Sequence, residues 1–107
     1  MKVNAVFNQS QVNFNAKANL KYPYVDMLNF APIKSLDMQL RKSPTNNIYE
    51  IGKTTYSNGT KKLCKHAVLL NGEKFADVVQ KKTDGVFGFV KKFMEKCVEK
   101  ENMIAKK

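Results

Sequence analysis

The soft metal ligands of the sequence, apart from the methionine thioethers, are Cys64, His66 and Cys97. On a strand, Cys64 and His66 would share one face, and Cys97 could join them from a helix packed on that face. A structural zinc site, however, uses four ligands that usually arrive as closely spaced pairs, and this set does not provide them. We therefore predict no metal and no cofactor, and we expect both cysteines to be free, small core residues.

Groups for catalysis are equally sparse. A Cys–His nucleophile needs an exposed thiol with a lowered pKa and a third group that orients the His, and the sequence indicates no such arrangement. Glu95, Glu99 and Glu101 lie among lysines, which is typical of a solvated helix surface. Residues 85–88 lack the Lys-Ser/Thr of a phosphate-binding loop. We predict that the protein is not an enzyme.

The stretch from residue 84 to 105 has the 3.6-residue period of a long amphipathic helix. Lysines and glutamates occupy its polar side, and Asp84, with Thr83 as the alternative, is placed to cap its first turn. The apolar stripe is wide enough to favour packing on a sheet. Its residues are Val86, Phe87, Phe89, Val90, Phe93, Met94, Cys97, Val98 and Ile104.

Alternating apolar and polar residues predict strands in the first half of the chain. The longest alternation covers residues 12–22, a shorter one covers residues 3–7, and residues 8–11 could turn between them to form a hairpin. Residues 36–40 form the clearest short strand. Residues 24–30, which lie between two prolines, could form two helical turns or a packed loop.

The second half of the chain predicts a three-stranded meander. Its arms are residues 48–56, 62–70 and 74–80, although the third arm could also begin a helix. Asn-Gly pairs at residues 58–59 and 71–72 mark the two turns, because Asn-Gly accommodates positive φ angles.

Together these elements predict an α+β fold in one domain, residues 1–107. We expect an antiparallel sheet of four to six strands within residues 1–80, with the helix at about 84–105 packed on one face. The sequence leaves open whether residues 1–20 are ordered without a partner.

Net charge is the unusual feature of the composition. The chain carries 19 basic and 9 acidic side chains, which gives a net charge of +10. Only Arg41 is an arginine, the side chain that makes bidentate contacts to phosphates and bases. No apolar run approaches the roughly 20 residues of a membrane span, and residues 1–11 do not resemble an export signal. These features predict a cytoplasmic protein with no membrane span.

An interaction module fits these observations best, because it requires no motif that the sequence lacks. We expect a small non-enzymatic inhibitor, adaptor or accessory subunit that docks by a sheet edge or an exposed apolar segment. Tyr22, Tyr24 and Phe30 would contact the protein partner. An acidic partner would also explain the net charge.

The alternative is a nucleic-acid-binding protein with a Lys-rich sheet and turn surface. Its contacts would come from Lys53, Lys61, Lys62, Lys65, Lys74, Lys81 and Lys82. The identity of the partner and the oligomeric state do not follow from the sequence.

Overall fold

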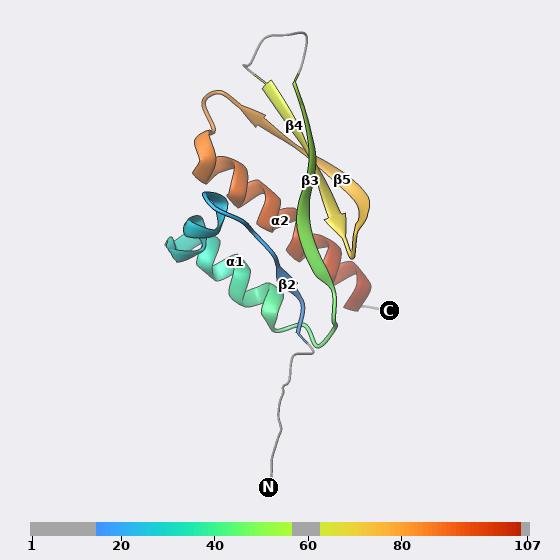
Figure 1. The fold of residues 1–107 in the computed structure, drawn as a ribbon. Coiled ribbons are helices and arrows are strands. Elements are labelled where there is room, and N and C mark those ends of the chain that lie inside the picture. Colours follow the sequence, from blue (N-terminus) through green and yellow to red (C-terminus); the bar gives the residue numbers. More distant parts are fainter. Residues whose placement is uncertain (1–14, 57–62, 106–107) are drawn as a thin grey trace, which may run out of the picture.

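The computed structural model of the protein describes residues 15–56 and 63–105. Helices and strands of this part of the chain enclose one core, which confirms the predicted α+β class (Figure 1). In chain order the elements are strand β2 (Lys17–Ala18), the 3-10 helix η1 (Tyr24–Asn29), helix α1 (Ala31–Arg41), strands β3 (Ile48–Tyr56), β4 (Leu63–Leu70) and β5 (Glu73–Lys81), and helix α2 (Gly85–Ala105).

The strands form one sheet in the order β2-β3-β4-β5. β3, β4 and β5 are antiparallel neighbours, but β2 runs parallel to β3, with Lys17 opposite Ile48. The prediction of an antiparallel sheet is therefore wrong at this edge. The reason is the connection: α1 lies between β2 and β3, and a helical crossover brings the chain back to the end of the sheet at which it started.

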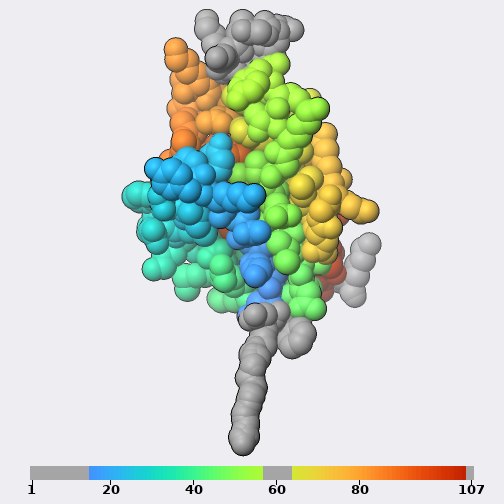
Figure 2. Space-filling model, in the orientation of Figure 1, coloured from blue at the N-terminus to red at the C-terminus, as the bar shows by residue number. Residues whose placement is uncertain are grey.

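The sheet is strongly curled, like half a barrel, and α2 lies along its concave side (Figure 1). Figure 2 shows β3 (green) between the η1 and α1 region (blue to cyan) and β5 (yellow) on one face of the molecule. β2 and β5 are therefore the two edges of the sheet.

Residues 36–40 belong to α1, so the strand predicted there is wrong. Ile33 and Leu40 are buried and Leu36 is half-buried, which is the i, i+3, i+7 spacing of a helix face. Met38, which completed the apparent alternation, is exposed. Pro32 lies in the first turn, where its missing N–H costs no helical hydrogen bond.

The alternation predicted for residues 12–22 is found at residues 15–20, but Tyr22, its last apolar position, is 80% exposed. Ala16, Ala18 and Leu20 are buried, and the polar residues between them are exposed. Only Lys17–Ala18 pairs as a strand, however. The predicted strand at residues 3–7 and the turn at 8–11 lie outside the described residues.

The meander of the second half is confirmed. β3, β4 and β5 cover the predicted arms, and the third arm is a strand throughout. Asn71 and Gly72 form the second turn with φ angles of 52° and 90°, which suits the Asn-Gly pair. The first turn, at residues 58–59, lies outside the described part of the chain.

The C-terminal helix is confirmed as part of the core. Phe89, Val90, Phe93, Met94 and Cys97 of α2 are completely buried, in one cluster with residues from all four strands and from α1. The sequence did not predict α1 as a second helix beside α2. Among the described residues, two polar side chains are buried beside this core, those of His66 and Glu101.

Candidate interaction surfaces

A buried carboxylate, Glu101 of α2, is the least expected polar group of the structure. Only 2% of the residue is exposed. Each of its oxygens accepts two hydrogen bonds, and all four donors are neutral. The donors are Ser43 Oγ (2.5 Å), Thr45 Oγ1 (2.6 Å), Asn47 Nδ2 (3.1 Å) and Tyr49 Oη (2.7 Å).

This arrangement corrects the prediction that Glu101 lies on a solvated helix surface. Glu95 and Glu99 are exposed as predicted. The signal for Glu101 was present: Ser43, Thr45, Asn47 and Tyr49 place donors at every second position before and into β3. In an extended chain, every second side chain points to the same face. If that face is buried, these donors need an acceptor.

The donors also determine how Glu101 titrates. Burial by itself raises the pKa of this carboxyl, but the four hydrogen bonds outweigh burial and lower it below the ordinary value. Burial, followed by the hydrogen bond to Glu101, raises the pKa of the Tyr49 phenol. Both groups therefore hold fixed protonation states near neutral pH, which is the behaviour of a structural cluster rather than an acid–base catalyst.

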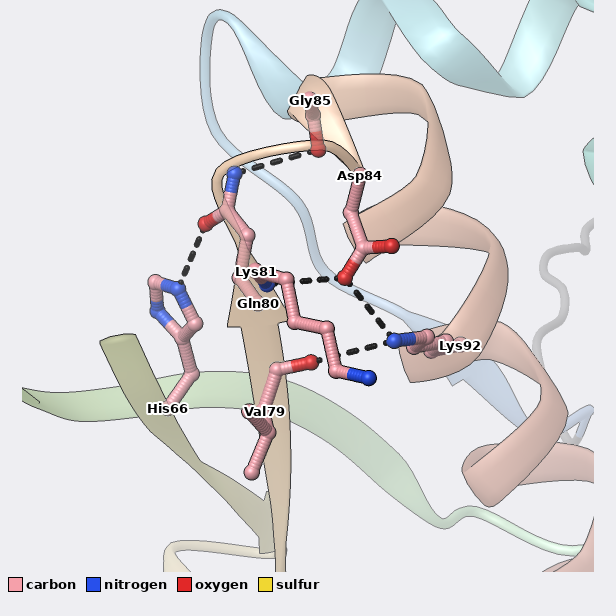
Figure 3. Close-up of polar contacts among 7 residues, drawn as sticks. All are labelled: His66, Val79, Gln80, Lys81, Asp84, Gly85 and Lys92. Atoms are coloured by element: carbon pink, nitrogen blue, oxygen red, sulfur yellow. Dashed lines mark hydrogen bonds and ion pairs between the residues drawn. The ribbon is translucent and has the colours of Figure 1, made fainter. Parts of the chain in front are cut away.

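A second polar array surrounds His66, which is 4% exposed. Gln80 donates its amide N–H to the Gly85 carbonyl (3.1 Å), so its amide oxygen faces His66 Nε2 (2.9 Å; Figure 3). Because that oxygen only accepts, Nε2 carries a proton, and the other ring nitrogen, Nδ1, is hydrogen-bonded to the Thr54 hydroxyl (2.8 Å). The imidazole lies against the Phe89 ring at 4.0 Å. His66 therefore lies inside the molecule.

The cysteines do not join His66 in a metal site. Within the described residues, no group of three or more His, Cys, Asp and Glu side chains could hold a metal ion. Cys97 is completely buried, and burial raises the pKa of its thiol, so it is unsuited to act as a thiolate nucleophile. Cys64 is half-buried, and both thiols are free.

The segment that was expected to contact a protein partner does expose aromatic side chains. We call residues 22–30 the η1 segment. Tyr22 is 80% exposed and Phe30 is 50% exposed, and the Phe30 ring packs edge-on against Phe87 of α2 at 6.0 Å. Phe87 itself is 39% exposed, although it was assigned to the apolar stripe of the helix.

Tyr24, the third aromatic residue of the prediction, has a different position. Its ring is half-buried and packs edge-on against Phe89 at 5.3 Å, so it anchors the η1 segment to the core. Met27 and Leu28 of η1 also pack against the core. The segment therefore has an inner side held by α2 and an outer side that exposes Tyr22 and Phe30.

The structure describes five of the seven lysines of the predicted Lys-rich surface. All five of its described lysines are exposed, and Lys61 and Lys62 lie outside the described residues. Lys65 and Lys81 alternate with inward-facing residues of their strands, which directs both to the convex side of the sheet. Lys74 is paired with Asp77 at 3.1 Å. The other four have no ion-pair partner among residues 15–56 and 63–105, and these are Lys53, Lys65, Lys81 and Lys82.

A groove follows the outer edge of β5, where this strand meets α2. The part of the groove near the C-terminal end of β5 has a volume of about 330 Å³ and lies beside Val78, Val79 and Lys92. The part near the N-terminal end of β5 has a volume of about 220 Å³ and lies beside Phe75 and Met103. Lys96 and Glu99 line both parts, so the two parts adjoin at these side chains.

Comparison with protein-family models gives no match, and neither the curated proteins nor the solved structures contain a significant match to the chain. Of the two helices in the described part of the chain, neither is long and apolar enough to cross a membrane.

Proposed function

We propose that this protein is a small non-enzymatic interaction module that docks a protein partner through the η1 segment and Phe87. The observation that carries the proposal is the Phe30–Phe87 ring pair, which joins two elements and still leaves both rings partly exposed. Aromatic side chains held in this way supply large contact area with little conformational entropy to lose, and they are enriched at the centres of interfaces.

The support beneath these rings favours docking without rearrangement. Tyr24 packs on Phe89, and the backbone of η1 is held by hydrogen bonds such as Phe30 N–H to the Met27 carbonyl (3.1 Å). A preorganised surface spends less of its binding free energy on ordering.

The charge around the segment favours an acidic partner. Lys21 and Lys34 flank the η1 segment, both are exposed, and neither has an ion-pair partner in the described part of the chain. A net charge of +10 also attracts an acidic protein over a distance.

The test compares two exposed apolar residues. Phe30→Ser removes the centre of the proposed surface, whereas Met38→Ser changes a residue of α1 that is 54% exposed. Tagged proteins are used to capture partners from nuclease-treated lysate of the source organism. We expect the parent and Met38→Ser to capture the same protein, and Phe30→Ser to lose it although its melting curve shows that it is folded at the temperature of capture. Equal capture by Phe30→Ser would contradict the proposal.

The same experiment tests the nucleic-acid alternative, which the unpaired lysines of the convex sheet face favour. Lys53→Glu combined with Lys65→Glu reverses two of these exposed charges. If nucleic acid is recovered without nuclease treatment, and this variant loses it while Phe30→Ser retains it, the lysine face is the binding surface.

A further inference from the structure

The outer edge of β5 presents backbone groups that no strand of the sheet pairs. The Val79 carbonyl accepts a hydrogen bond from the Lys92 ammonium (3.4 Å), and the Lys81 N–H donates one to Asp84 Oδ2 (2.8 Å; Figure 3). Val79 and Lys81 therefore direct their backbone groups away from β4. Since these groups alternate along a strand, Asp77 also directs its N–H and carbonyl outward. An edge of this kind is a template for another strand.

Among the described residues, side chains form hydrogen bonds with this edge only at Val79 and Lys81, its C-terminal end. Asp84 binds both Lys81 N–H and Lys92 (2.9 Å), and Lys92 in turn covers the Val79 carbonyl. The Lys92 ammonium, followed by Lys81 N–H, lowers the pKa of Asp84, so this closure persists through neutral pH. Next to this closure, the Val79 N–H and the outward backbone groups of Asp77 border the groove against α2.

The groove combines apolar and charged side chains. Phe75, Ala76, Val78 and Val79 contribute apolar surface from β5, and Met103, which is 59% exposed, contributes it from α2. The charged side chains come mainly from one stripe of α2. In chain order they are Lys92, Glu95, Lys96, Glu99 and Lys100.

The charges of this stripe are complementary to those of a second, antiparallel α2. When the two-fold axis between the two helices passes between positions 97 and 98, Glu95 faces Lys100 of the second copy. In the same alignment Lys96 faces Glu99 of the second copy. All four contacts around the axis then join opposite charges. A strongly acidic or basic partner would find no such match, because lysines and carboxylates alternate along the groove.

We propose that this groove binds a second copy of the chain. β5 of each copy pairs antiparallel with β5 of the other around a two-fold axis, which extends the four-stranded sheet across the interface. The two α2 helices then lie side by side and exchange the charge pairs described above. The proposal does not depend on the η1 segment, but a dimer would carry two such segments and bind a repetitive partner with avidity.

The overall charge sets the conditions under which the dimer forms. Each copy carries +10, so long-range repulsion opposes association at low ionic strength. Salt screens this repulsion over about 8–10 Å, whereas the backbone hydrogen bonds of the paired edges are insensitive to it. We expect dimerisation to strengthen as salt rises from low to moderate concentration.

The first test removes one outward N–H. Val79→Pro deletes a donor that faces away from β4, so no hydrogen bond of the existing ladder is lost, and edge strands tolerate proline there. Val79→Ala is the matched control, since it shortens the same exposed side chain and keeps the N–H. By sedimentation equilibrium at moderate salt, the parent and Val79→Ala should form a dimer, and Val79→Pro should weaken its dissociation constant at least tenfold.

The second test exchanges charges and leaves the backbone unchanged. Glu99→Lys places like charges opposite each other across the axis and should weaken the dimer, whereas Lys96→Glu combined with Glu99→Lys restores the pairs and should recover it. Circular dichroism verifies that each variant is folded. A parent protein that stays monomeric at millimolar concentration would overturn the proposal, and so would a dimer that is unaffected by both Val79→Pro and Glu99→Lys.

Discussion

Glu101 illustrates at the scale of one residue how a charge is kept in the interior without a cation. Transfer of a carboxylate from water into a protein is costly unless its oxygens are hydrogen-bonded. Here two hydroxyls, an amide and a phenol make these bonds. Three of the four donors lie at or just before the start of β3, so the carboxylate joins the end of α2 to the entrance of the sheet.

Replacement of this carboxylate gives a prediction for stability. Glu101→Gln keeps the size of the side chain but turns one acceptor oxygen into a donor that faces other donors. We expect the free energy of unfolding at pH 7 to fall by roughly 1–3 kcal/mol, the cost of buried polar groups left without partners. Urea denaturation measures this decrease in the free energy of unfolding. An unchanged midpoint of the urea transition would show that the donors find other acceptors.

The pH dependence follows from the lowered pKa of Glu101. Because the unfolded chain binds this proton more readily, stability from Glu101 is present above the ordinary pKa of a Glu, roughly 4.3, and is lost as pH falls through the lower pKa of the folded state. The parent should therefore lose more stability between pH 6 and pH 3 than Glu101→Gln does. Asp84→Asn is the control for the exposed carboxyl whose pKa is also lowered.

At the scale of elements, α2 organises the molecule because its apolar face belongs to one buried cluster with residues of every strand and of α1. Neither the curled sheet nor α1 encloses a core alone. Phe93, which lies near the middle of the helix, is a completely buried member of this cluster.

Truncation of Phe93 tests this role of α2. We expect Phe93→Ala to lower the free energy of unfolding by roughly 3–5 kcal/mol, which is a large part of the stability of so small a domain. Met103→Ala in the same helix removes an exposed side chain and should change stability by less than about 0.5 kcal/mol. A Phe93→Ala protein with the parent's melting temperature would show that α2 is not essential to the core.

For the whole molecule, the excess of positive charge opposes the compact state. The described residues contain five ion pairs, and four of them join residues three or four positions apart on one element. Pairs of this exposed, local kind contribute little, so they do not offset the repulsion among the remaining lysines.

Salt should therefore stabilise the monomer. We expect the melting temperature to rise when NaCl is increased from about 20 mM to about 300 mM, since the Debye length falls below the distances between most lysines. The measurement is made at a protein concentration that keeps the chain monomeric. A falling melting temperature would mean that the ion pairs contribute more than the repulsion.

Local patterns in the sequence were sufficient for α2 and for the meander. The apolar stripe of α2 repeats over about five turns, and an Asn-Gly turn depends only on the conformations that its own residues adopt. The exposed aromatic residues Tyr22 and Phe30 were also identified, because the η1 segment carries more apolar groups than a short segment between prolines can bury. These features depend on neighbouring residues alone, so they survive without knowledge of the fold.

Contacts between distant residues decided the rest. The Leu36-x-Met38-x-Leu40 alternation is compatible with a strand or with a helix, and burial of Ile33 and Leu40 against the core selects the helix. That choice makes the connection from β2 to β3 a crossover and the pair parallel. Glu101 is separated from its donors by 52–58 residues, so its burial becomes apparent only when α2 and the start of β3 are brought together. Periodicity describes which side of an element is apolar, whereas the partner of that side is set by the free energy of packing the whole chain.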